Sequence, residues 1–318
     1  MVSRFQRWTL PLALASLATA PSFASAAGWY DNFNDGNAKD GSPVTWATTP
    51  LPGVYSATTG DFLLSAPGDP DGEEGAAFDD NSLIASVNQN FPADVYVRTQ
   101  TLVLPGPNEG ELGGTLGVFA RYNPATVSGY AAILSNGTDL QLLLVDGGAA
   151  FELDSFNIDV DTAADALIQL DVIGDLLNVY AWRPGTAKPT EPTMTINDST
   201  FTSGHAGIVY NENDDNTTGV FRFVTASDAP LPAPVAGDYD NDLDVDGADF
   251  LLWQRDFGST VNLAADGNGN QVVDDADLQV WKTAFGPGAT AVIAAVPEPS
   301  SLVLLATAAL GLCIRKPR

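Results

Sequence analysis

Residues 238–258 and 266–286 are two copies of one sequence, offset by 28 positions. Eight positions are identical in the two copies: Asp238 and Asp266, Val245 and Val273, Asp246 and Asp274, Ala248 and Ala276, Asp249 and Asp277, Trp253 and Trp281, Phe257 and Phe285, and Gly258 and Gly286. Coincidence is a poor account of so many matches. The chain therefore contains a duplicated unit, and its fold has to accommodate both copies.

Each copy begins with oxygen-bearing side chains at positions 1, 3, 5, 9 and 12 of a loop. In the first copy these are Asp238, Asp240, Asp242, Asp246 and Asp249, and in the second they are Asp266, Asn268, Asn270, Asp274 and Asp277. Calcium takes six to eight oxygen ligands, and this spacing wraps a loop around one ion while position 7 supplies its backbone carbonyl. Asp244 and Val272 occupy position 7. The sequence therefore predicts two Ca²⁺ ions.

The loops run directly into amphipathic helices. Phe250, Trp253 and Phe257 lie on one helical face in the first copy, and Leu278, Trp281 and Phe285 repeat the pattern in the second. A duplicated loop-helix unit with Asp at position 12 resembles type I dockerin, over residues 237–286. That resemblance implies a cohesin-like partner.

Two positions depart from the dockerin pattern. Position 6 usually needs glycine for its turn, but here it holds Leu243 and Gln271, which costs about 1 kcal/mol or more per loop if the geometry is kept. Positions 10 and 11 hold Gly247-Ala248 and Asp275-Ala276 where dockerins usually carry small hydroxyl residues. A calcium-folded stalk without any partner is the alternative interpretation.

Residues 27–226 contain many short runs of β-branched and aromatic residues separated by turn residues. The runs lie at 94–104, 114–122, 129–134, 140–145, 166–172, 176–182 and 220–225. Several alternate apolar and polar residues, and none has a helical period. We therefore expect a mainly β fold, an antiparallel jelly-roll β-sandwich, followed by the small helical module.

The sequences Asp31-Asn32-Phe33, 117–122, Gly129-Tyr130 and 203–207 resemble those of concanavalin A-like and laminin-G-like domains. This resemblance implies binding or cleavage of glycans, so an extracellular polysaccharide is a candidate partner. Arg121, Tyr122 and Tyr130 are the candidate ligand-binding residues, through stacking on sugar rings and hydrogen bonds. The alternative, which the sequence favours, is a structural role: a strand arginine paired with a neighbouring acidic residue, beside two core tyrosines.

The two ends of the chain carry sorting signals. Residues 1–26 have Arg4 and Arg7, an apolar stretch and Ala24-Ser25-Ala26, as in a signal peptide. Residues 296–318 combine Pro297-Glu298-Pro299, an apolar run too short to span a bilayer comfortably, and a basic tail. They resemble the PEP-CTERM signal, which implies removal by an exosortase; an ordinary membrane anchor is the alternative. Both predict an extracellular or outer-surface protein.

Charge and composition support this location. The formal net charge is −27, which disfavours nucleic acid as a partner. The single cysteine, Cys313, lies in the sorting segment, so the mature chain forms no disulfide. Residues 227–236, rich in Pro and Ala, and residues 287–295 are predicted linkers.

We therefore expect an exported, noncatalytic protein that binds glycan or matrix and carries a calcium-folded module. One alternative is a glycoside hydrolase with a dispersed carboxylate pair that the sequence does not reveal. The string Glu152 to Asn157 has two acidic residues at the spacing of a retaining pair, but Asn157 stands in the third acidic position, so an exposed acidic rim explains it better. The other alternative is a structural coat protein without a sugar ligand.

Overall fold

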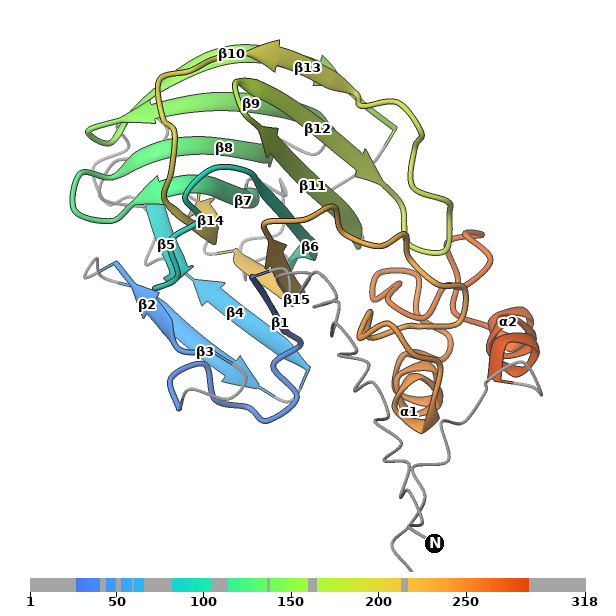
Figure 1. The fold of residues 1–318 in the computed structure, drawn as a ribbon. Helices are drawn as coiled ribbons and strands as arrows, with labels where there is room; N and C mark the ends of the chain where they lie inside the picture. The colour runs from blue at the N-terminus through green and yellow to red at the C-terminus, as the bar shows by residue number, and fades with distance from the viewer. Residues whose placement is uncertain are drawn as a thin grey trace, which may run out of the picture.

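The computed structural model describes residues 27–40, 44–49, 53–58, 60–65, 82–104, 114–135, 138–159, 165–212 and 217–285. The predicted signal peptide (1–26), the second linker (287–295) and the sorting segment (296–318) lie outside these ranges. Within them, two antiparallel sheets are followed by a pair of helices (Figure 1).

The first sheet has eight strands and carries the helical module on its outer side. Its order is β13 (Met194–Asn197), β12 (Leu176–Trp182), β11 (Ala166–Ile173), β6 (Val95–Leu104), β15 (Thr218–Ser227), β4 (Asp61–Ser65) and β3 (Val54–Thr58), with β1 (Gly28–Asp31) paired to β15.

The second sheet has seven strands. Its order is β10 (Ala149–Asn157), β9 (Asp139–Asp146), β8 (Ser128–Ser135), β7 (Gly114–Asn123), β14 (His205–Glu212), β5 (Ser82–Val87) and β2 (Trp46–Thr48). All seven runs singled out in the sequence are strands, so the prediction of a mainly β, antiparallel sandwich is confirmed.

The core lies between the two sheets, and β7 shows how the alternation builds it. Val118 and Ala120 belong to the main buried cluster, whereas Phe119 belongs to a second cluster on the opposite face of the same sheet. Side chains change face at each residue of a strand, so both faces of this central strand are apolar and buried.

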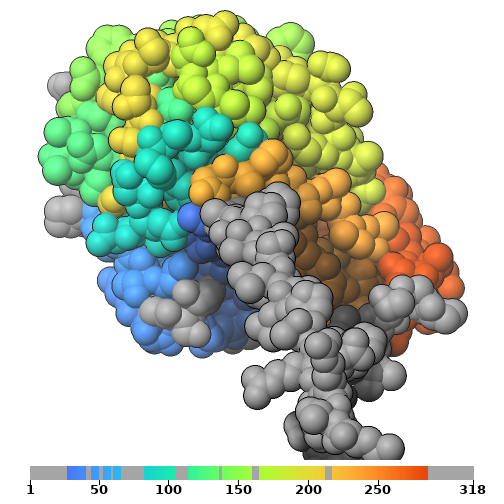
Figure 2. Space-filling model, viewed as in Figure 1, coloured from blue at the N-terminus to red at the C-terminus, as the bar shows by residue number. Residues whose placement is uncertain are grey.

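The chain leaves β15 through residues 228–236 and enters the C-terminal module, residues 237–285. Arg98 of β6 is 2% exposed and donates from Nη1 to the Pro232 carbonyl at 2.9 Å, which fixes the linker on the sandwich. The module contains α1 (Gly247–Asp256) and α2 (Asp275–Phe285), each starting just after a loop. Figure 2 shows this module, orange to red, lying directly against the yellow-green segment that follows β12.

Candidate metal centre

In the first loop, the aspartates at positions 1 and 12 organise the backbone. Asp238 accepts hydrogen bonds from the backbone N–H groups of Asp242 at 3.1 Å and Leu243 at 3.0 Å. Asp249 accepts from Tyr239, from Asp240 at 3.2 Å and from Asp246 at 2.7 Å. The loop is thus closed by carboxylates turned toward its own interior.

The second loop repeats the same pattern. Asp266 accepts from Asn270 at 3.1 Å and Gln271 at 2.7 Å. Asp277 accepts from Asn268 at 3.1 Å and from Asp274 at 2.7 Å. The two copies therefore share one loop geometry as well as one sequence.

Position 6 adopts the left-handed backbone that the spacing predicts. Leu243 has φ +80° and Gln271 has φ +69°, and position 4 is also left-handed, with φ +60° at Asn241 and +72° at Gly269. This conformation is about 1–2 kcal/mol less favourable for residues other than glycine. Strain of that size persists when the surrounding contacts enforce it, and it is typical of binding loops.

The structure brings the predicted ligands of the first loop together in two groups. One carboxylate oxygen each of Asp238, Asp240 and Asp242 lies within 4.8 Å of the others, and so do those of Asp244, Asp246 and Asp249. The second loop has Asn268 and Asn270 in place of two of these aspartates. Both sets offer hard oxygen donors of the kind that calcium prefers.

The electrostatics of the first loop favour a cation. Burial raises the pKa of Asp238 to about 8, and repulsion from the nearby Asp249 carboxylate adds to the effect. Burial also raises the pKa of Asp240 to about 7, again with repulsion from neighbouring carboxylates. These charges are costly together, and a bound divalent ion would offset that cost.

The two loops are joined through tryptophans. Trp253 of α1 donates from Nε1 to the carbonyl of Asp274 at 2.9 Å, and Trp281 of α2 donates to the carbonyl of Asp246 at 2.8 Å. Phe250 lies between the indoles, with ring centroids 5.6 Å from Trp253 and 5.2 Å from Trp281. Each helix therefore supports position 9 of the opposite loop.

The first loop also contacts the sandwich. Tyr30 of β1 donates its hydroxyl to the Asp240 carbonyl, and Asn32 approaches the Asp240 carboxylate at 3.5 Å. Asn241 donates to Oε1 of Gln100 on β6 at 3.4 Å. The conformation of this loop is consequently linked to the position of the module on the sheet.

A second joint lies at the segment between the two copies. Arg222 of β15 is 8% exposed and binds Asp165 with two hydrogen bonds, of 3.0 and 3.2 Å. It also donates to Asp61 at 2.7 Å and to Asn262 of the module at 2.9 Å. Asp165 in turn accepts from the backbone N–H of Leu263. The buried guanidinium of Arg222 therefore connects three parts of the chain.

The three candidate sugar-binding residues are all buried. Arg121 donates twice to the Ala93 carbonyl, at 3.1 and 2.9 Å, and once to the Phe201 carbonyl at 2.7 Å. Tyr130 donates to Asp198 at 2.6 Å, and Tyr122 packs in the second apolar cluster. Arg121 also lines a surface cavity of about 320 Å³ together with Asn123, Ser128, Asp146 and Thr200. Tyr122 and Tyr130 are not among the residues lining this cavity.

The acidic string on β10 does not form the paired arrangement of a retaining hydrolase. A bulge between Glu152 and Asp154 places these residues opposite Leu143 and Leu142 of β9. Leu143 and Leu142 belong to clusters on opposite faces of the sheet, so the two carboxylates point to opposite sides. This strand therefore presents no pair of carboxylates on one face, consistent with the interpretation of the string as an acidic rim.

Several residues at the joint were not singled out in the sequence, namely Tyr30, Gln100, Asp165, Gly185 and Arg222. Arg98 and Gln100 are the polar members of an alternating strand, a pattern that ordinarily indicates a solvent-exposed face. Here the linker and the module cover that face. The covering segments are more than 100 residues away in the chain. The sequence around Arg98 and Gln100 therefore does not indicate that these residues are covered.

Comparisons with known proteins identify one segment and a general likeness of fold. Residues 295–318 match the PEP-CTERM protein-sorting motif. No curated protein sequence matches the chain.

Similar solved structures include three sugar-binding or lectin-like domains. The carbohydrate-binding module CBM66 from Bacillus subtilis is 16% identical, covering 57% of this chain and 94% of its own, with a TM-score of 0.43. The legume lectin-like domain from Entamoeba histolytica is 11% identical, with 58% and 90% covered and a TM-score of 0.40. The exoplasmic domain of VIP36, bound to Ca²⁺ and Man3GlcNAc, is 13% identical, with 60% and 87% covered and a TM-score of 0.41. The fold assignment rests on the two sheets described above.

The sorting motif defines the class of this protein. It is an exported protein of the cell surface or extracellular space whose C-terminal signal is cleaved, and processing by an exosortase follows from the same motif. In the part of the chain that the structure describes, no helix has the length and apolar character needed to cross a bilayer.

Proposed function

We propose that this protein is a noncatalytic surface component whose residues 237–286 form a dockerin-like module that binds two Ca²⁺ ions. The observation that carries the proposal is the identical arrangement of two loops, in which the carboxylates at positions 1 and 12 accept the same backbone N–H groups. Asp238, Asp240, Asp242, Asp246 and Asp249 would hold the first ion, and Asp266, Asn268, Asn270, Asp274 and Asp277 the second. The position 7 carbonyls of Asp244 and Val272 complete the two sets.

The ions would also stabilise the joint between module and sandwich. Asp240 is a proposed ligand, and its carbonyl accepts the hydroxyl of Tyr30 on β1. Because the ion neutralises the crowded carboxylates, it favours the loop conformation that makes this contact. Calcium would therefore stabilise the contact between two parts of one chain. A cohesin-like partner would bind at the exposed residues Gly247 and Asp275 at the starts of the helices.

Calorimetric titration of chelator-treated mature protein with calcium tests the proposal. We expect two bound ions together with a gain in helical circular dichroism. The double variant Asp238→Ala with Asp249→Ala should bind one ion. Asp175→Ala, which removes an exposed carboxylate in the β11–β12 turn, should still bind two. Absence of binding heat at millimolar calcium would contradict the proposal.

We further propose that the sandwich binds an extracellular polysaccharide, at the cavity lined by Arg121. Its lining of hydroxyl, amide and carboxylate groups suits sugar hydroxyls. Arg121 itself is engaged with carbonyls, so its part is to shape the cavity floor. A glycan array probed with the mature chain is the test. Sugar cleavage would favour the hydrolase alternative, and failure to bind any glycan would favour a coat protein.

A further inference from the structure

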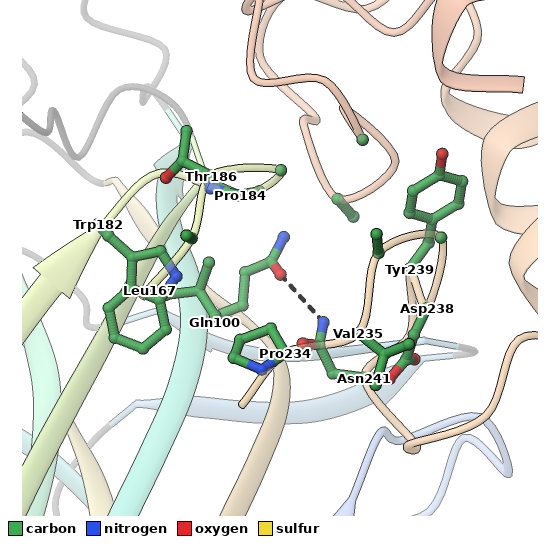
Figure 3. A pocket seen from close by; sticks show the side chains of 16 residues that line it. Gln100, Leu167, Trp182, Pro184, Thr186, Pro234, Val235, Asp238, Tyr239 and Asn241 are labelled. Carbon is green, nitrogen blue, oxygen red and sulfur yellow. Dashed lines mark hydrogen bonds between the residues drawn. The ribbon is translucent and has the colours of Figure 1, made fainter. Parts of the chain in front are cut away.

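A second cavity, of about 240 Å³, lies where the C-terminal module meets the outer face of the eight-stranded sheet (Figure 3). On the sheet side it is lined by Gln100 of β6, Trp182 of β12 and Pro184 in the following turn. On the module side it is lined by Asp238 and Asn241 of the first loop, and Pro234 of the linker closes it. Neither the calcium ligation nor the Arg121 cavity explains this space.

Gln100 carries an unmet hydrogen-bonding group at this cavity. The side chain is 1% exposed, and its Oε1 accepts from Asn241, but its Nε2 has no hydrogen-bond partner. Figure 3 shows the amide in the midst of the lining residues, with its nitrogen turned away from Asn241. Turning the amide over would only exchange the orphan atom. Buried amides are rarely left in this state, so one more polar partner is expected there.

The surroundings of Gln100 make the amide more unusual. Its register neighbours on the strands at either side are Phe223 of β15 and Leu167 of β11, and Leu167 is in turn opposite Trp182. Gln100 is therefore the single polar member of an otherwise apolar row across four strands. A leucine at this position would have no unpaired donor of its own, although it would remove the acceptor of the bond from Asn241. The contact with Asn241 therefore accounts for Oε1 of the amide, but nothing in the protein accounts for its Nε2.

The charge and polarity of the lining residues indicate which kind of ligand the cavity could bind. Asp238 is the only charged lining residue, and its carboxylate is turned into its own loop, where it accepts two backbone N–H groups. The remaining polar groups are neutral amides and hydroxyls, while Trp182 and the prolines provide flat apolar walls. Such a mixture suits a neutral molecule with both hydroxyls and an apolar face. The volume is below the roughly 300–1,000 Å³ of drug-sized sites, so it suits one ring.

We propose that this cavity binds a single neutral sugar ring, with Gln100 Nε2 donating to a ring hydroxyl and Trp182 packing against the apolar face of the ring. The cavity is distinct from the one lined by Arg121. The proposal for this cavity does not depend on the loops binding calcium. Because Asn241 and Asp238 belong to the module, the ligand would contact both parts of the chain at once. It would thereby strengthen their association.

The test is saturation-transfer NMR and calorimetry on the mature chain in the presence of calcium. The ligands are glucose, galactose, mannose and N-acetylglucosamine, each at up to about 10 mM, a concentration high enough to detect weak binding with a millimolar dissociation constant. We expect at least one sugar to bind. Gln100→Leu should weaken that binding about tenfold, as expected for loss of one good hydrogen bond. Asp175→Ala, which removes an exposed carboxylate that lines neither cavity, should leave this binding unchanged. Asn123→Ala, in the Arg121 cavity, identifies any binding at that other cavity.

Three results would overturn the proposal. One is failure of all four sugars to bind, with crystals showing only water in the cavity. Another is binding that Gln100→Leu does not affect. The third is binding that Asn123→Ala abolishes while Gln100→Leu preserves it, which would assign the sugar to the Arg121 cavity.

Discussion

The indole of Trp253 donates a 2.9 Å hydrogen bond to the backbone carbonyl of Asp274, in the loop of the opposite copy. Asp274 stands at position 9 of the second loop, so a side chain on α1 supports a candidate metal loop that precedes α2. Trp281 makes the equivalent bond to Asp246 at 2.8 Å. The two loops are therefore energetically coupled, because neither can open without disturbing a tryptophan of the other unit.

Trp253→Phe should weaken calcium binding at the second loop, although no ligand is altered. The variant leaves the Asp274 carbonyl unpaired, at a cost of about 1–2 kcal/mol. Calorimetry should show one of the two sites weakened, with a lower thermal midpoint. Phe257→Leu is the control, since Phe257 packs on Trp253 at 5.1 Å but is 53% exposed. Equal effects of the two variants would contradict the coupling.

Leu243→Gly should tighten calcium binding at the first loop. Leu243 has φ +80° and is 50% exposed, so the substitution relieves backbone strain and removes little packing. A net relief of about 1 kcal/mol corresponds to roughly fivefold tighter binding. Val272→Gly is the matched control, because Val272 is not left-handed and glycine there only adds conformational freedom. Tighter binding in both variants would argue against strain as the cause.

The β-sandwich and the loops were predictable because both depend on local pattern. Alternation placed Val118 and Ala120 on the face opposite Phe119, and loop spacing led to the left-handed Leu243. The helices α1 and α2 begin at loop position 10, so the aspartates at position 12, Asp249 and Asp277, lie in their first turns.

Tertiary contacts account for what the sequence could not reveal. Gln100 has the alternation of a solvent-facing residue, yet segments more than 100 positions away bury it. Arg121 looks like a binding residue because its type suits sugars, but a bulge turns it toward two carbonyls. In both cases the decisive partner comes from a distant part of the chain.

Arg121→Met should destabilise the sandwich substantially. The guanidinium is buried and makes three hydrogen bonds to the carbonyls of Ala93 and Phe201, which methionine cannot replace. We expect a loss of about 2–4 kcal/mol in the free energy of unfolding, measured in urea. Arg183→Met removes an exposed ion pair to Asp159 and should cost less than about 1 kcal/mol. A small loss of stability in Arg121→Met would contradict this structural role and would support a role of Arg121 in ligand binding.

The contact between Tyr130 and Asp198 should make stability depend on acid pH. Burial raises the pKa of Asp198, but hydrogen bonds from Tyr130 and Thr200 outweigh it and hold the pKa below its usual value. A lowered folded-state pKa stabilises the protein above the unfolded value, about 3.9, and this contribution is lost as the pH falls through the folded value.

Tyr130→Phe should therefore lose stability relative to wild type at pH 7, and the difference should shrink as the pH falls below about 4. Urea unfolding at the two pH values measures it. In an Asp198→Asn background the effect of Tyr130→Phe should no longer vary with pH. A constant difference in the wild-type background would contradict the assignment.

Gly185→Ala should separate the C-terminal module from the sandwich. Gly185 has φ +72°, and a Cβ built there would lie 1.9 Å from the carbonyl oxygen of Asp266 and 2.8 Å from the nitrogen of Gly269, both in the second loop. Backbone strain and overlap together should cost roughly 2–6 kcal/mol. Gly174→Ala is the matched control: its φ is +59° but nothing lies within 4 Å, so only strain of about 1–2 kcal/mol applies. Limited proteolysis in the linker, residues 228–236, should become faster in Gly185→Ala and stay unchanged in Gly174→Ala. Equal protection of the linker in both variants would show that the module does not depend on this contact to stay on the sheet.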